Sequence, residues 1–497
     1  MFGFVRRQTG ATCFGLGLEL TVLVLDSTDT RVVLVSIDTL GIGTSEADEL
    51  RAQLANVTGA APEGIVLNWS HTHNAPPANR NILNRSGLLA NDGDERHDAY
   101  WSLLCDAVTE AATAAVSRLE PAATVWGVGE VDVSVNRREV GPDGTVVHGW
   151  NVEGLLDRQV VTLQVRRPDE SVIATLVGFG CHPVSVGMDF SGYSSDFPGA
   201  MRRRIREWTG GDCAYFQGAA GNVLPRASFL PDEIEAERIG EILALEALHS
   251  VSDKFANPTH LIQQSDGSLI PMILFRFEQD PHEDVYLRAA EHHLRLPLQP
   301  IPTETELIKM HGEYSQAILA AEQRGAGDAE VYGLKYHEKW VRRTLESVRA
   351  GTTHEWVQAQ LHAIRIGDGA IVTSPGESFT EIGMAVKQRS PARPTLYAGY
   401  TNGAIGYFPT ADAYEFGGYE PVYSNRSYGQ AATVSPDTAR LLIEASVTLL
   451  ESLFPDSPTA DLRNLNVSVD LPALPKLPLY RPQFGDYSPP VTAQHPH

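Results

Sequence analysis

The sequence is poor in cysteine, in positive charge and in long apolar runs, and each shortage argues against a class of protein. Its 4 cysteines lie far apart without a Cys-x-x-Cys pair, which argues against a disulfide scaffold and against a cysteine zinc knot. The 39 basic residues are outnumbered by 62 acidic ones, which argues against nucleic acid or an anionic membrane as the main partner. No apolar run approaches the roughly 20 residues of a membrane span, and residues 1–12 lack the pattern of a secretion signal. We therefore expect a cytoplasmic enzyme.

Apolar periodicity predicts a layered α/β fold, because strands and helices alternate along the chain. We expect strands at 18–24, 32–37, 65–67, 123–128, 131–136, 159–166, 172–179 and 213–216, and helices at 44–57, 98–118 and 198–208. Farther along we expect a helical stretch at 280–350, a strand at 358–373, and helices at 378–387 and 436–453. This pattern assigns one domain to residues 1–453 and a proline-rich tail to residues 454–497.

Two histidines follow the short apolar strand at 65–67. In an extended chain, residues i and i+2 point to the same side, so His71 and His73 are expected to face one cleft. Open α/β sheets bind ligands at the carboxyl ends of their strands, and His182 also leaves an apolar strand. Neutral imidazole is a good zinc ligand. Two ordinary polar histidines at a strand exit would give the same pattern, so this segment alone leaves both interpretations open.

For three other polar features of the sequence we expect ordinary structural roles or a loop close to a ligand. The arginines of the run 202–206 are expected to lie on a solvated helix face. His292, His293, His311 and His337, in the stretch 280–350, are expected at the surface. The loop 218–222 is built from small residues, and such a loop lets backbone amides approach a ligand closely.

Eight short motifs occur in one order along residues 1–430. They are Met1-Phe2-Gly3-Phe4, Val35-Ser36-Ile37-Asp38, Ser70-His71-Thr72-His73, Asn136-Arg137, Cys181-His182-Pro183, Ser195-Asp196, Pro375-Gly376-Glu377, and Tyr407-x6-Tyr414-x4-Tyr419-Glu420. Each is short, but together and in this order they resemble the motifs of the neutral/alkaline ceramidases, the non-lysosomal zinc amidases. The resemblance implies an α/β fold, namely a layered mixed-sheet catalytic domain of neutral-ceramidase type. It also implies a metal cofactor, Zn2+.

The resemblance implies zinc ligands and neighbouring catalytic groups by position. The ligands would be His71, His182, Glu377 and Tyr414, with room left for a water whose pKa the metal lowers.

The catalytic groups implied are His73, Asp38, Arg137 and Tyr428. His73 would hydrogen-bond the developing oxyanion or shuttle a proton, and Asp38 would orient an imidazole. Arg137 would hold an anionic or carbonyl group of the substrate, although a surface arginine is an open alternative. Tyr428 would aid the transition state, and Tyr423 competes with it for this role.

Two departures from the family bear on the mechanism. Gly218 stands where the family has a serine implicated in catalysis, so we expect attack by zinc-activated water without a serine nucleophile. The C-terminal immunoglobulin-like domain of the family is expected to be lacking, because the tail 454–497 has no counterpart to it.

The expected function is therefore that of a zinc-dependent hydrolase cleaving a linear amide of an N-acyl amine. An esterase of the same fold, an amidohydrolase-type metal barrel and a catalytically silent binding protein are the alternatives. The expected partner is a small-molecule amide or ester substrate, and the stretch 280–350 is a candidate lid that sets specificity. The sequence leaves a homo-oligomer open.

Overall fold

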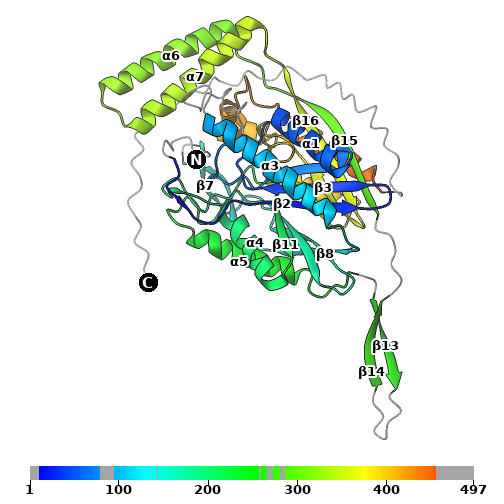
Figure 1. The fold of residues 1–497 in the computed structure, drawn as a ribbon. Coiled ribbons are helices and arrows are strands. Elements are labelled where there is room, and N and C mark those ends of the chain that lie inside the picture. The colour runs from blue at the N-terminus through cyan, green and yellow to red at the C-terminus, as the bar shows by residue number, and fades with distance from the viewer. Residues whose placement is uncertain are drawn as a thin grey trace, which may run out of the picture. The chain divides into compact units, whose positions relative to one another are not determined.

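The computed structural model describes residues 10–78, 95–142, 144–256, 259–265, 273–279 and 286–454 of the chain (Figure 1). The motif at 1–4 and the tail from residue 455 onward lie outside the described residues. Within these ranges, no helix combines the length and the apolar character that crossing a membrane requires.

The first large sheet has the order β2 (Leu20–Asp26), β3 (Arg31–Ile37), β4 (Ile65–Trp69). Strands β3 and β4 are parallel, and α1 (Thr44–Thr58) connects them. One face of this sheet packs against α1 and α3 (Glu95–Ser117). Val33 and Val35 point to this helical face whereas Val32 and Leu34 point the other way, so β3 is buried on both sides.

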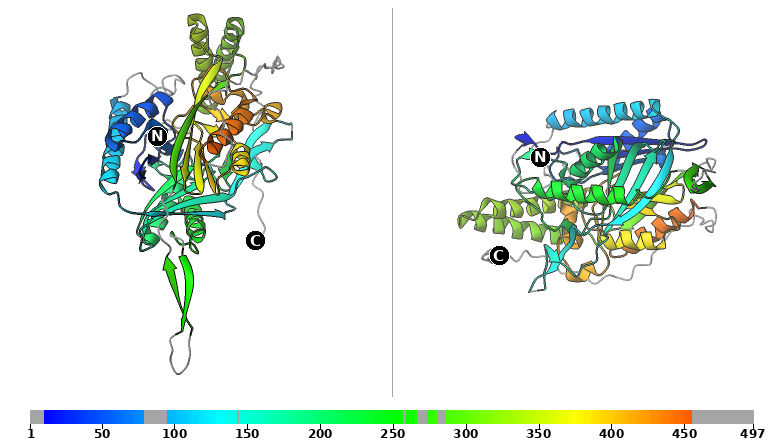
Figure 2. Two further views of the ribbon diagram at one scale, coloured as in Figure 1. Left: turned by 90° about the vertical axis from the view of Figure 1, so that its right-hand side faces the viewer. Right: turned by 90° about the horizontal axis from the view of Figure 1, so that it is seen from below.

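The second large sheet has the order β11 (Asp212–Gln217), β9 (Val172–Phe179), β8 (Gln159–Arg166), β5 (Ala123–Glu130). Strands β9 and β11 are parallel, and α4 (Asp196–Thr209) lies between them in sequence. Helix α4 packs with α5 (Ile234–His249) on one face of this sheet (Figure 2).

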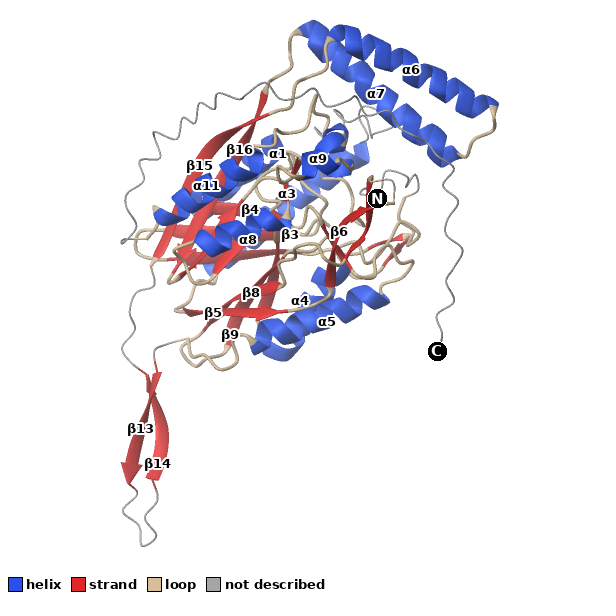
Figure 3. Ribbon diagram, turned by 180° about the vertical axis from the view of Figure 1, so that it is seen from behind, coloured by secondary structure: helices blue, strands red, loops and turns tan. Residues whose placement is uncertain are grey.

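The third large sheet has the order β15 (Leu287–Pro297), β16 (Trp356–Ile366), β17 (Gly369–Thr373), β19 (Thr395–Ala398). Strands β17 and β19 are parallel, with α8 (Thr380–Arg389) between them in sequence. Helix α8 and α11 (Thr438–Glu451) pack against this sheet (Figure 3). Between β15 and β16 the chain forms two antiparallel-packed helices, α6 (Glu304–Gln323) and α7 (Asp328–Ala350).

Smaller elements complete the described structure. They are β1 (Cys13–Phe14) with β10 (Gly192–Tyr193); β12 (Val223–Pro225), β6 (Ser134–Val140) and β7 (Val146–Asn151); β18 (Glu377–Ser378) with β20 (Tyr407–Phe408); β13 (Thr259–Ser265) with β14 (Ile273–Gln279); and the short helices η1 (Pro62–Gly64), α9 (Ala413–Phe416), α10 (Tyr419–Val422) and η2 (Ser424–Arg426).

The three large sheets share one apolar core. Leu34 of β3, Leu176 of β9 and Ile371 of β17 belong to the same buried cluster, together with residues of β4, β8, β11, β15, β16 and β19. Each of the three sheets also contains one pair of parallel strands, and the chain between the two strands of each pair includes a helix. Functional groups of parallel pairs gather at the carboxyl ends of the strands.

The side-chain amide of Asn68 joins the carboxyl ends of three of these strands. It is fully buried at the end of β4. Its Oδ1 accepts the backbone N–H of Gln217 (2.7 Å), at the end of β11. Its Nδ2 donates to the carbonyl of Gly399 (2.8 Å) and to Oγ1 of Thr401 (3.0 Å), just after β19. These bonds satisfy backbone groups that burial would otherwise leave unpaired.

The sequence predicted many of these elements, but it missed helix α5 and strand β19, and it misassigned part of 280–350. Residues 287–297 form strand β15, whose eleven residues pair with β16. Within the described residues 286–350, the helices are α6 and α7. The alternation of polar and apolar residues in His293-Leu294-Arg295-Leu296 is a strand pattern, and their burial alternates with it. The predicted strand 358–373 is two strands, because Gly367 has a φ of 60° and turns the chain.

We expect Asn68→Ala to destabilise the fold by about 3 kcal/mol, because it leaves several buried polar groups without partners. Urea unfolding followed by circular dichroism measures this change. Asn56→Ala, at an exposed position on α1, is the matched control and is expected to change stability by less than about 0.5 kcal/mol. An equal effect of the two substitutions would contradict the role given to the Asn68 amide.

Candidate metal centre

Three histidines converge at the carboxyl ends of β4 and β9. His71 and His73 follow β4, and His182 follows β9. The ring centroid of His71 lies 5.0 Å from that of His73 and 5.0 Å from that of His182. One ring nitrogen of each residue lies within 4.8 Å of the others. His71 and His182 are buried, whereas His73 is half-buried. This group can hold a metal ion.

The local backbone reaches this arrangement by a turn and not by strand alternation. Strand β4 ends at Trp69, and His71 has a φ of 65°, in the left-handed region. The Oγ1 of Thr72 donates to the carbonyl of Ser194 (2.6 Å) and accepts the backbone N–H of Asn74 (3.2 Å). The prediction that the two histidines face one point is therefore confirmed, but the reason given for it, an extended chain, is wrong.

Backbone carbonyls set the tautomers of two imidazoles. His71 Nδ1 lies 2.5 Å from the carbonyl oxygen of Leu40, and His182 Nδ1 lies 2.6 Å from that of Ala220. A carbonyl can only accept, so each Nδ1 carries a proton, and in the neutral form of either ring Nε2 keeps the lone pair. Burial lowers the pKa of His71 to about 4, which keeps this ring neutral near pH 7.

The carboxylate of Glu377 faces these lone pairs. Its Oε2 lies 3.1 Å from His182 Nε2 and 3.5 Å from His71 Nε2. The hydroxyl of Tyr400 donates to Oε2 (3.3 Å) and that of Tyr428 donates to Oε1. Burial alone would raise the pKa of Glu377, but positive charge on His71 and His182 and the Tyr428 hydroxyl hold it well below its usual range, so Glu377 loses its proton before the His71 imidazole does. Glu377 is therefore ionised.

The donor set fits a divalent cation. Two imidazole Nε2 lone pairs and an ionised carboxylate oxygen point at one another, an arrangement that is repulsive until a positive charge lies among them. Imidazole nitrogen with carboxylate oxygen is a ligand combination that suits zinc and several other first-row metals.

Asp38 is not the group that orients the imidazoles. It is buried, and both of its oxygens accept from the buried guanidinium of Arg202, with Nη1 to Oδ1 at 3.1 Å. Its Oδ2 also accepts the backbone N–H of Glu19 (2.9 Å). Asp38 thus anchors the start of the 38–40 loop, whose carbonyls at Thr39 and Leu40 bind His71. The prediction that all the arginines of 202–206 are solvated is wrong for Arg202, because this ion pair requires its burial.

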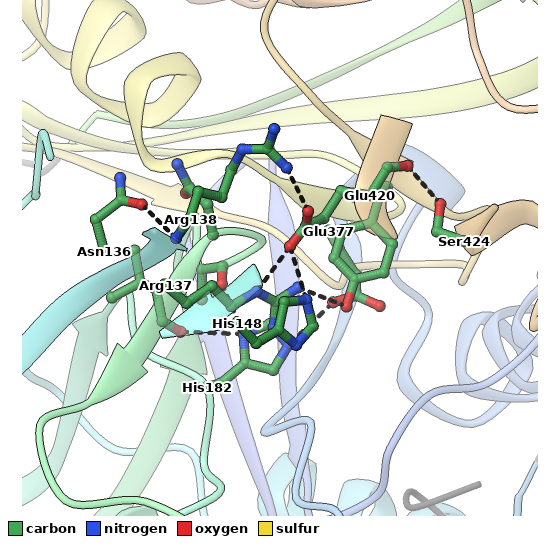
Figure 4. Close-up of polar contacts among 12 residues, drawn as sticks. Asn136, Arg137, Arg138, His148, His182, Glu377, Glu420 and Ser424 are labelled. Carbon is green, nitrogen blue, oxygen red and sulfur yellow. Dashed lines mark hydrogen bonds and ion pairs between the residues drawn. The ribbon is translucent and has the colours of Figure 1, made fainter. Parts of the chain in front are cut away.

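Arg137 is buried beside the candidate metal centre, so the alternative of a surface arginine is wrong. Its Nε donates to Glu420 Oε1 (2.8 Å) and its Nη2 to the hydroxyl of Tyr407 (3.1 Å). Glu420 also accepts from Arg138 Nη1 (2.5 Å) and lies 3.3 Å from His148 Nε2 (Figure 4). Two arginines therefore balance one fully buried carboxylate. Sequence reasoning missed His148, because it lies on β7 outside the motifs that resemble the family.

The structure brings Tyr428, and not Tyr414, to the histidines and Glu377. The hydroxyl of Tyr414 is buried and donates to the carbonyl of Val434 (2.6 Å). The tyrosine spacing that resembles the ceramidases selected Tyr414 as a ligand, but the chain around α9 and α10 brings the later Tyr428 to Glu377. Tyr423, the competing choice, packs against Tyr419 with ring centroids 5.2 Å apart.

The loop 218–222 supports the site through close packing and a carbonyl. A Cβ on Gly218 would lie 3.0 Å from the backbone of Gly180, so this position has little room for any side chain. A Cβ on Gly221 would lie 2.4 Å from the carbonyl oxygen of Glu377. The loop therefore needs small residues to bring His182 and Glu377 together. The sequence predicted that backbone amides of this loop would approach a ligand. In the structure, the loop instead contacts His182 through the Ala220 carbonyl.

No model of a known protein family matches this sequence, and no curated protein matches it. Solved structures do match. A neutral ceramidase from Pseudomonas aeruginosa superimposes with a TM-score of 0.60 over 91% of this chain and 71% of its own, at 16% identity. A ceramidase complexed with C2 gives a TM-score of 0.62 over 93% of this chain and 73% of its own, also at 16% identity. The chain therefore has the fold of the neutral ceramidases, as its motifs predicted.

Proposed function

We propose that this protein is a zinc-dependent hydrolase that cleaves a linear amide of an N-acyl amine. The observation that carries the proposal is the convergence of the His71 and His182 Nε2 lone pairs on the Glu377 carboxylate. The fold adds support, because a ceramidase cleaves the amide of ceramide, and this chain shares its architecture.

His71, His182 and Glu377 are the proposed ligands. Tyr414 is left out because its hydroxyl is engaged by Val434. A bound zinc ion supplies Lewis acidity and a coordinated water with a pKa lowered towards about 7. The Leu40 and Ala220 carbonyls hold two of the ligand rings in the required tautomer.

The remaining residues have roles that follow from their positions. His73 is half-buried beside the ligands, where it can take a proton from the attacking water and give it to the leaving amine. The Tyr428 hydroxyl fixes Oε1 of Glu377, while Oε2, which also accepts from Tyr400, is the oxygen that faces the two Nε2 atoms. Arg137 adds a permanent positive charge nearby, which favours negative charge developing on the substrate carbonyl.

Water is the proposed attacking group because position 218 offers no nucleophile. Glycine stands there, and its surroundings leave little room for a serine side chain. The same groups would also act on an ester, so substrate tests should pair each amide with its ester analogue.

We expect the purified protein to contain close to one zinc ion per chain, and His182→Ala to contain much less, because it removes one proposed ligand. Elemental analysis measures both. His249→Ala is the matched control, since the His249 side chain is 79% exposed. If the folded wild-type protein takes up no zinc when zinc is supplied, the proposed hydrolase mechanism is wrong. The likeness to the ceramidases would then be one of fold alone, and a binding protein would be the better description.

We expect His73→Ala to keep its zinc while kcat on a short N-acyl amide falls by about 10²–10⁴-fold, because the substitution removes a proton-transfer group. Zinc content and turnover are measured on the same preparation. His293→Ala, whose side chain is 49% exposed, controls for the loss of an imidazole. Loss of zinc together with activity would instead make His73 a ligand, and this part of the proposal would be wrong.

A further inference from the structure

The α6–α7 hairpin contacts the short segment that carries Tyr428. Tyr336, His337 and Trp340 lie on α7, and the first and last of them are four residues apart, so they share one helix face. The segment they contact is 424–430, which contains η2 and the turn after it. We call residues 424–430 the tyrosine segment.

Two hydrogen bonds hold this segment from α7 on both sides of Tyr428. The hydroxyl of Tyr336 shares a hydrogen bond with Ser427 Oγ (2.9 Å). The indole Nε1 of Trp340 donates to the carbonyl of Gln430 (2.8 Å). Ser427 directly precedes Tyr428, and Gln430 follows it by two residues. The helix therefore holds the side chain that precedes the tyrosine and the backbone that follows it.

A buried guanidinium adds a third connection. Arg426 Nη1 donates to His337 Nδ1 on α7 (2.6 Å) and to the hydroxyl of Tyr314 on α6 (3.2 Å). The guanidinium also lies over the ring of Trp340, 4.5 Å from its centroid. Burial and the Arg426 charge lower the pKa of His337 to about 3, so this imidazole stays a neutral acceptor. His337 is thus half-buried and engaged by Arg426, where an ordinary surface histidine was predicted.

The tyrosine segment in turn contacts Glu377 of the candidate metal centre. Tyr428 reaches Glu377 from this segment and donates its hydroxyl to Oε1. Its hydroxyl lies at the far end of the ring, so a small tilt of the backbone moves it by a larger distance. Gln430 also ties the segment to the chain beside Glu377, because its Nε2 donates to the carbonyl of Ile405 (2.6 Å) and the next carbonyl, that of Gly406, accepts the backbone N–H of Glu377 (2.9 Å).

We infer that the α6–α7 hairpin is a positioning element that sets the Tyr428 hydroxyl against Glu377, with Tyr336, His337 and Trp340 as positioning residues. The catalytic consequence rests on the proposed hydrolase function, whereas the positioning itself does not. This role differs from that of the predicted lid, since it acts through Glu377 and not through coverage of the substrate.

The test uses two conservative variants, Tyr336→Phe and Trp340→Phe, each of which removes one hydrogen bond and keeps an aromatic ring. The full-length protein is labelled with 13C at Cζ of tyrosine, and the Tyr428 resonance is assigned through Tyr428→Phe. The matched control is Arg349→Ala, which breaks an exposed α6–α7 ion pair to Glu304 (2.8 Å) that does not involve the tyrosine segment.

We expect the Tyr428 resonance to shift in both variants and to stay unchanged in Arg349→Ala. With an amide substrate, we expect kcat to fall about ten- to a hundredfold in both variants, with KM and zinc content unchanged. A Tyr428 resonance that stays at its wild-type position in both folded variants would overturn the inference. If the wild-type protein cleaves no amide, the proposed function fails, and the resonance alone still decides whether the hairpin positions Tyr428.

Discussion

The arrangement of the whole site depends on one buried amide. Asn68 satisfies backbone groups at the ends of β11 and β19 while standing at the end of β4, so three strands from three sheets are held at one junction. Parallel strands gather functional groups at their carboxyl ends. Here the carboxyl ends of three parallel strand pairs lie close together, and the hydrogen bonds of Asn68 fix their relative positions. His71 follows one of these pairs, His182 another and Glu377 the third.

Charge in this region is neutralised in separate pairs. Asp38 is paired with Arg202, and Glu420 with Arg137 and Arg138, so these carboxylates are already compensated. Glu377 differs, because its neighbours are imidazoles and phenol hydroxyls. Because backbone carbonyls orient the imidazoles, no further carboxylate is needed beside them. A cation bound there would meet one uncompensated negative charge, and the surrounding ion pairs would not compete for it.

Much of the fold could be predicted from the sequence, because its strands are strongly apolar and its helices are periodic. The convergence of His71, His73 and His182 followed from their places at strand ends. What failed depends on long-range partners. Tyr414 and Tyr428 are alike in sequence, and only the turns between them decide which one reaches Glu377. Arg202 looks like its exposed neighbours until Asp38, 164 residues away, is placed against it. The end of strand β15 alternates between polar and apolar residues, but the helical pattern of the residues that follow led to a helix prediction for the whole stretch.

The insertion point of α6 and α7 has a consequence for how this protein can vary. Pro297 and Trp356 are paired partners at the adjoining ends of β15 and β16, and Leu298 donates its backbone N–H to Glu355 (2.8 Å). The chain therefore leaves and re-enters the sheet at neighbouring positions. Insertions and deletions at such sites disturb a fold little. A change of length in this helical module would leave the strand register behind it intact, and its effect would fall on the contacts that α7 makes with the tyrosine segment.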